Sequence, residues 1–406
     1  MLGATDINTE EGLWHLEEFF STCNRFSDPC KKYTQIHRDL MKYILTHSRK
    51  GKFYTPLALI HGRCDGTLGF GEGNMWGISD LGYCDAEESW KAANVFYPCA
   101  KINDCFYLHP CPDDKPVGFY SGTPMGNVDI IPIEALNKVS GEYKALSFMG
   151  YNFATEADFR ELHDFVKGGG TLLLTHAHLA ETTDIYDIKN NNLSFGNSPL
   201  SFTQGNPLFT KDTVSKAEIA VCTNLTGTYE TLEETDSKIP LVVRYNVEKG
   251  NVILFNTSAY PGNPSIKCLY EKYLKKVMSD ITENETVWAS ANDSVEFCVY
   301  DNNETKTLYF LAVDWYNNPE TPRYATLKAG KYSYEIEVPF GTMIKCVSNG
   351  EKSVWTCDQN GEILKLSNNK IIVQGSGISE FVLAENGNFK KLSIDFSKEV
   401  IREILF

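Results

Sequence analysis

The chain has 406 residues, of which 42% are hydrophobic and 22% are charged, and this balance predicts ordered globular domains. At roughly 100–200 residues per domain, the length predicts two or three of them. The net charge of −15 is unfavourable for nucleic acid and for anionic membrane surfaces, so we expect a neutral ligand. No stretch approaches the ~20 apolar residues of a membrane span, and no signal peptide is visible. These features predict a cytoplasmic protein with no nucleic-acid or membrane partner.

The first part of the chain is helical in pattern. Asn8 can cap a helix over residues 9–22, and apolar residues at three- and four-residue spacings predict a second helix over about 31–48. We therefore expect an N-terminal helical segment over residues 1–52. The twelve cysteines form no CxxC pair, and the six-residue spacing of Cys99, Cys105 and Cys111 matches no metal-ligand pattern. No cofactor is expected.

From about residue 53, apolar strands alternate with helices. In "TEADFRELHDFVKGGGTLLLTH", Thr155 can cap a helix with Asp158 at its third position, and a strand follows the glycines directly. With the preceding strand "YKALSFMG", this pattern predicts a right-handed parallel crossover. Residues 180–235 are polar and are expected to form a long excursion. Two strands in "IPLVVRYNVEKGNVILFNTS" and a closing helix complete an α/β domain over residues 53–284.

After about residue 285 the helical period disappears and strand-type runs take over. The pairs Asn349-Gly350 and Asn360-Gly361 are strong signals for hairpin turns. Short strands at regular spacing predict an antiparallel β-sandwich over residues 285–406, including a C-terminal tail. The expected fold class is therefore an α/β parallel-sheet domain followed by a β-sandwich.

Three stretches carry a resemblance to a known family: "GTPMGNVDIIPIEAL", "YKALSFMGYNFATEADFRELHDFVKGGGTLLLTHAHL" and the closing helix "LYEKYLKKV", which leads into the β-domain. Over about residues 53–390 the chain resembles the back half of beta-galactosidases, with a flavodoxin-like, glutamine-amidotransferase-like trimerisation domain and a C-terminal β-domain. The resemblance implies a carbohydrate substrate and a homo-oligomer such as a trimer.

One departure from that family bears on catalysis. Those enzymes hold their catalytic carboxylates on a (β/α)₈ barrel of about 250 residues, whereas only about 50 residues precede the first parallel strand here. We therefore expect either one subunit of a split glycoside hydrolase, acting in complex with a barrel-containing subunit, or a stand-alone relative.

The glycine-rich stretch "HGRCDGTLGFGEGNMWG" follows the first parallel strand, where ligands gather in open α/β sheets. Carbohydrate sites combine an aromatic face with planar polar groups. The residues of this stretch that fit a sugar site are the carboxylates Asp65 and Glu72, as candidate catalytic groups, and His61, Arg63, Asn74 and Trp76, as candidate substrate-binding groups. In the competing interpretation, Arg63 and Asp65 form a structural ion pair and Trp76 packs in a domain interface.

Other chemistries fit the sequence less well. Gly71-Glu72-Gly73 begins a dinucleotide fingerprint, but Trp76 occupies the position of its last glycine. Amidotransferase chemistry needs a cysteine on a strand-to-helix turn, and the segment after "GGTLLL" reads Thr175-His176-Ala177-His178.

His176 and His178 are the one metal-ligand candidate. Two residues apart on an extended segment, they share a face, and a third ligand would come from Glu181, Asp184 or His61. The competing interpretation is a pair of histidines hydrogen-bonded at a sheet edge. Three hypotheses follow: a component of a beta-galactosidase-like glycoside hydrolase, a non-catalytic assembly subunit without its own ligand site, and a metal-dependent enzyme.

Overall fold

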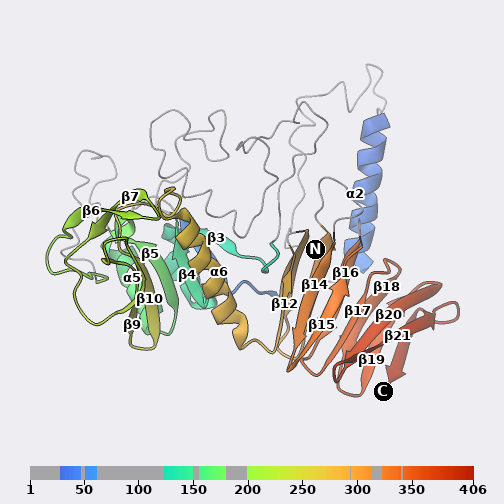
Figure 1. Ribbon diagram of the computed structural model, residues 1–406. Helices are drawn as coiled ribbons and strands as arrows, with labels where there is room; N and C mark the ends of the chain where they lie inside the picture. Colours follow the sequence, from blue (N-terminus) through green and yellow to red (C-terminus); the bar gives the residue numbers. More distant parts are fainter. Residues whose placement is uncertain are drawn as a thin grey trace. The chain divides into compact units, whose positions relative to one another are not determined.

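The computed structural model describes residues 28–46, 51–61, 123–149, 155–179, 199–292, 294–312, 322–339 and 342–406. These residues form two compact units, an α/β unit from Thr55 to Trp288 and a β unit that takes Ala289–Ala312, Arg323–Phe406 and the segment ending at Tyr54. The expected α/β-plus-β fold class is confirmed (Figure 1). No described helix has both the length and the apolar character needed to cross a membrane.

The helix expected near the N-terminus is α2 (Asp28–Thr46). The helices of the α/β unit are α4 (Leu136–Val139), α5 (Glu156–Lys167) and α6 (Lys267–Glu283), with 3-10 turns η3 (Ile133–Ala135), η4 (Ser140–Glu142) and η5 (His176–Leu179). Its strands are β2 (Leu57–His61), β3 (Asp129–Pro132), β4 (Ala145–Phe148), β5 (Thr171–Thr175), β6 (Phe209–Val214), β7 (Ala217–Cys222), β8 (Glu230–Glu234), β9 (Pro240–Val247) and β10 (Gly250–Phe255). The predicted helix over 9–22 lies outside the described residues.

Seven of these strands form one mixed sheet in the order β3-β2-β4-β5-β10-β9-β8. The first five are parallel to one another, and β9 and β8 continue the sheet in antiparallel pairing. The four parallel strands β2, β4, β5 and β10 are buried along almost their whole length, as a sheet with both faces covered requires, whereas the edge strand β3 is buried only at Ile131.

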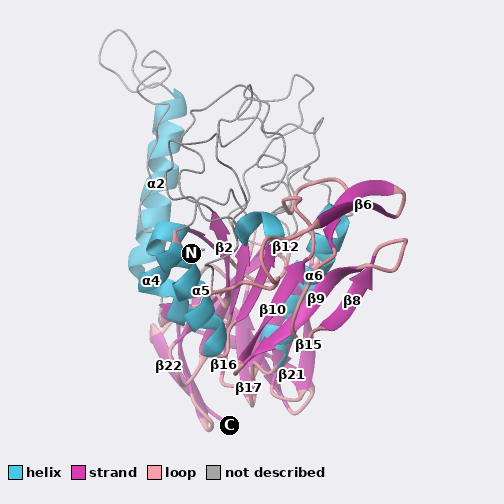
Figure 2. Ribbon diagram, turned by 90° about the vertical axis from the view of Figure 1, so that its left-hand side faces the viewer, coloured by secondary structure: helices cyan, strands magenta, loops and turns pink. Residues whose placement is uncertain are grey.

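Helices α5 and α6 cover opposite faces of the mixed sheet (Figures 1 and 2). Phe159, Leu162 and Val166 of α5 pack on one face in a shared core with β2, β4, β5 and β10. On the other face, the ring of Tyr270 on α6 packs at a tilt against Phe255 of β10, with 4.8 Å between the ring centroids. The Tyr270 hydroxyl also hydrogen-bonds Ser147 at 2.7 Å and donates to the Phe148 carbonyl at 2.9 Å.

The capping box predicted for α5 is confirmed. The Thr155 side chain accepts from the Asp158 amide at 3.3 Å, and the Asp158 carboxylate accepts from the Thr155 amide at 2.7 Å. The polar excursion predicted over 180–235 is wrong for its second half, because β6, β7 and β8 lie there. β6 and β8 are exposed or half-buried along their length, so they lack the apolar alternation by which strands are recognised. β7 buries Ile219, Val221 and Cys222.

The strands of the β unit are β1 (Lys52–Phe53), β11 (Val287–Ala291), β12 (Val295–Asp301), β13 (Lys306–Ala312), β14 (Tyr324–Ala329), β15 (Tyr332–Glu337), β16 (Met343–Ser348), β17 (Lys352–Thr356), β18 (Gly361–Leu366), β19 (Lys370–Gly375), β20 (Ile378–Glu385), β21 (Asn388–Asp395) and β22 (Ile401–Leu405). A central sheet has the order β1-β12-β13-β16-β17-β20-β21, and two smaller sheets have the orders β11-β14-β15 and β18-β19-β22. All the pairings among these strands that the structure describes are antiparallel.

The two smaller sheets lie on opposite faces of the central sheet. Val354 of β17 belongs to a core cluster with Ile363 of β18 and Val373 of β19. Its neighbour Trp355 points to the other face, since successive strand residues alternate, and lies 6.3 Å from the ring of Tyr334 on β15. The two-layer sandwich expected from the sequence is therefore extended by a third layer.

One predicted hairpin is present and one is wrong. Asn349-Gly350 joins β16 to β17, with Gly350 at φ +87° and the Asn349 side chain accepting from the amides of Glu351 and Lys352. Asn360-Gly361 forms no hairpin between β17 and β18, because these strands belong to different sheets. The turn residues are correct for a change of direction, but the chain uses that change to move from one layer to the next.

The β5–β10 pairing depends on a close backbone approach at Gly250. A Cβ at this position would lie 2.2 Å from the Val166 carbonyl oxygen and 2.3 Å from the Gly170 carbonyl oxygen. We expect Gly250→Ala to lower the free energy of unfolding by about 1–3 kcal/mol, because backbone atoms must shift to admit the methyl group. Urea titration measures this change. Gly141→Ala is the matched control, since its Cβ would meet nothing within 4 Å, and an equal loss in both variants would contradict the prediction.

Candidate functional site at the carboxyl edge of the parallel strands

The carboxyl ends of the parallel strands meet at one edge of the mixed sheet. His61 ends β2, and η5 follows β5 with His176 and His178. Asn256 follows β10, directly beside the end of β5 in the parallel register. Residues 80 positions apart in the sequence are thus brought together, at the kind of edge where open α/β sheets hold ligands.

Asn256 is the centre of the hydrogen bonds at this edge. Its side-chain Nδ2 donates to the carbonyl oxygens of Cys222 at 2.8 Å and Pro240 at 2.7 Å. Both protons of the Asn256 side-chain amide are donated in these two hydrogen bonds. The Asn256 Oδ1 is therefore the acceptor for His176 Nε2 at 3.1 Å. This arrangement fixes the His176 tautomer with its proton on Nε2.

His178 is held by its own turn. Its Nδ1 accepts from the Thr175 backbone amide at 3.0 Å, and because an amide can only donate, Nδ1 carries a lone pair and the proton sits on Nε2. The ring stacks on Phe148 with 4.4 Å between centroids, and Tyr260 approaches its edge at 5.3 Å. His178 is fully buried and, in this tautomer, neutral.

The β6–β7 hairpin covers the same edge. The Phe209 ring meets the His176 ring edge-on at 5.9 Å, and the Cys222 amide donates to the Asn256 carbonyl at 3.1 Å. An isolated bridge joins Val221 to Thr257. The part of the edge beyond β5 and β10 is consequently packed by protein.

The geometry is unfavourable for a shared metal ion on the two histidines. A metal at His178 Nε2 would require its proton to move to Nδ1, and Nδ1 already accepts from the Thr175 amide. His61 lies two strand spacings from β5, about 10 Å away. Within the described ranges no group of three or more metal-ligating side chains is present. The other proposed ligands, Glu181 and Asp184, lie outside the described residues.

Most of the predicted sugar-site residues also lie outside the described residues: Arg63, Asp65, Glu72, Asn74 and Trp76. His61 is described and sits partly buried at the end of β2, so the stretch that bears them begins at the carboxyl edge. Their assignment as catalytic and substrate-binding groups remains a prediction.

Sequence reasoning missed Asn256. A signal for it exists, because in "VILFN" and "TLLLTH" a polar residue directly follows a buried strand with an apolar centre. Two such strands that are neighbours in a parallel sheet must place these residues side by side. The sequence does not reveal that β5 and β10 are neighbours, and for that reason the His176–Asn256 pair was not expected.

The chain matches no protein-family model and no curated protein. Among solved structures it is similar to Gan42B, a GH42 beta-galactosidase from G. stearothermophilus, with 10% identity and a TM-score of 0.43 over 93% of this chain and 45% of that one. It is also similar to a beta-galactosidase from Bacillus circulans sp. alkalophilus, with 12% identity and a TM-score of 0.38 over 73% and 42% of the two chains. Both are beta-galactosidases, the kind of enzyme that the sequence resembles, and the chain spans less than half of their length.

The buried imidazole of His176 makes the stability of the folded chain depend on pH. Burial lowers the pKa of His176 from 6.5 to about 4, and the hydrogen bond to Asn256 opposes this shift only in part. Between pH 6.5 and 4 the unfolded chain therefore binds a proton that the folded chain does not. The resulting loss of stability grows as the pH falls and reaches about 3 kcal/mol below pH 4.

The His176→Gln variant retains a donor toward Asn256 and does not titrate. When the pH falls from 6.5 to 4.5, we expect its free energy of unfolding to decrease by roughly 2–3 kcal/mol less than that of the native chain. Urea titrations across this range measure the difference. His163→Gln on the partly exposed side of α5 is the control variant. The prediction is contradicted if the free energy of unfolding depends on pH equally in His176→Gln and in the native chain.

Proposed function

We propose that the chain is a component of a carbohydrate-active protein of the beta-galactosidase-like glycoside hydrolase type. The observation that carries this proposal is the identity of the residues in the turn after β5. In an amidotransferase this turn would need a nucleophile, and here it holds two buried histidines engaged with Asn256 and Thr175. Such a turn suits a domain that binds or assembles rather than one that hydrolyses glutamine.

In this proposal the α/β unit is flavodoxin-like, of the glutamine-amidotransferase type. The parallel crossover β4-α5-β5 and the helices on both faces of the sheet support it. The unit assembles the protein, as a homo-oligomer such as a trimer or in complex with a barrel-containing subunit. The β unit that follows in the chain has the antiparallel character of the C-terminal domain in the enzymes that the sequence resembles.

The sugar site of this proposal lies beyond His61, where the chain leaves β2 at the carboxyl edge. The stretch that begins there supplies an aromatic face in Trp76 and the carboxylates Asp65 and Glu72. Hydrolysis of a glycosidic bond uses two carboxylates about 5–10 Å apart, and these two are our candidates for that pair. The substrate is a carbohydrate, and no cofactor takes part.

A second candidate is a non-catalytic assembly subunit without a ligand site of its own. The observation that favours it is the closure of the edge beyond β5 and β10, where Phe209 and Asn256 pack against His176. A packed edge of this kind suits a structural role in which the mixed sheet only presents surfaces to other subunits.

Activity measurements separate the two candidates. If the chain contributes catalytic carboxylates, it hydrolyses a nitrophenyl glycoside, alone or mixed with a barrel-containing chain. Glu72→Gln then lowers the rate by at least about 100-fold, the scale of one general acid–base group. Glu283→Gln, at an exposed position of α6, is the matched control. Activity that needs the second chain and is unchanged in Glu72→Gln and Asp65→Asn would establish the assembly role instead.

A further inference from the structure

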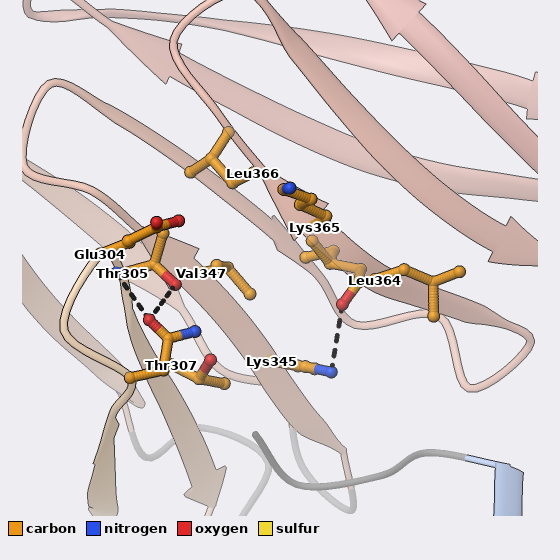
Figure 3. A pocket seen from close by; sticks show the side chains of 10 residues that line it. Glu304, Thr305, Thr307, Lys345, Val347, Leu364, Lys365 and Leu366 are labelled. Atoms are coloured by element: carbon orange, nitrogen blue, oxygen red, sulfur yellow. Dashed lines mark hydrogen bonds between the residues drawn. The ribbon is translucent and has the colours of Figure 1, made fainter. Parts of the chain in front are cut away.

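The β unit contains a cavity of about 200 Å³ between the central sheet and β18 (Figure 3). Thr307 of β13 and Lys345 of β16 form part of its floor, with exposed fractions of only 4% and 5%. Glu304 and Lys365 stand at its rim, where both are exposed. Since a cavity of about 150 Å³ can hold a benzene molecule, this volume suits a molecule of about monosaccharide size.

The charges around the cavity are balanced. Lys345 forms a buried ion pair with Glu362 and also donates to the Ile363 carbonyl at 3.3 Å. The rim carries one carboxylate, Glu304, and one ammonium, Lys365. A ligand with a net charge would disturb this balance in a region of low dielectric, so the lining favours a neutral molecule.

The lining mixes hydrogen-bonding groups with apolar walls. Thr305 and Thr307 contribute hydroxyl groups, and the Thr305 hydroxyl donates to Asn302 Oδ1 at 3.0 Å, which leaves its oxygen able to accept. Val347 and Leu366 supply methyl groups on the walls (Figure 3). A ring that carries several hydroxyls both donates and accepts, and its C–H surface packs against such methyl groups.

From this cavity, we propose that the β unit holds a binding site for a neutral polyhydroxylated molecule of monosaccharide size. This inference goes beyond the proposed function. The sugar site proposed above lies in the α/β unit, beyond His61, whereas this one lies in the β unit. It depends on the side chains of the cavity alone and requires no hydrolytic activity.

Methyl groups in the cavity allow a direct test. With the Ile, Leu and Val methyl groups of the full chain isotopically labelled, titration with D-galactose and D-glucose should shift the resonances of Val347, Leu364 and Leu366 saturably. Thr307→Val keeps the side-chain volume and removes one hydroxyl at the floor, so it should raise the dissociation constant about tenfold, the equivalent of one hydrogen bond.

Thr326→Val is the matched control, since it makes the same change on an exposed position of β14 in the same unit, and it should leave the dissociation constant unchanged. Thermal melting of both variants checks that they fold. Inorganic phosphate serves as the competing probe. Absence of saturable shifts with either sugar, shifts confined to other methyl groups, shifts with phosphate alone, or equal effects of the two variants would each overturn the proposal. These readouts do not depend on whether the chain hydrolyses a glycoside.

Discussion

The parallel pairing of β5 with β10 is the contact on which the α/β unit depends. It joins segments 80 residues apart, and Gly250 permits it by letting the backbone pass within reach of the Gly170 carbonyl. A side-chain hydrogen bond from Asn251 to Thr171 at 3.1 Å secures the same register. This pairing brings Asn256 beside His176, and without it the carboxyl edge would lack the group that orients the imidazole.

The carboxyl edge shows how burial directs the chemistry of polar groups. His176 and His178 are both enclosed, and each has one ring nitrogen committed to a neighbouring amide group. Burial favours the neutral form of His176, because a charged imidazolium would lose its hydration. Both rings therefore act as hydrogen-bonded parts of the core, with the geometry of structural residues.

The β unit buries two charged side chains as an ion pair. Lys345 and Glu362 are almost fully enclosed between the central sheet and β18, and each compensates the charge of the other. A buried pair of this kind contributes little net stability, although removal of one partner costs about 3–5 kcal/mol. Lys345 also forms part of the floor of the cavity, whose other lining residues include threonine hydroxyls and aliphatic side chains.

The sequence by itself determined the elements with strong local signals: α5 with its capping box, the apolar parallel strands and the Asn349-Gly350 hairpin. These depend on residues close in the chain, so periodicity and turn chemistry reveal them. It also determined the resemblance to beta-galactosidases through its motifs. Only the tertiary structure decided the neighbours of each strand, the third layer of the β unit and the position of the β6–β7 hairpin on the carboxyl edge. These depend on contacts between distant segments, which no local pattern records, and the His176–Asn256 pair and the Lys345–Glu362 pair follow from them.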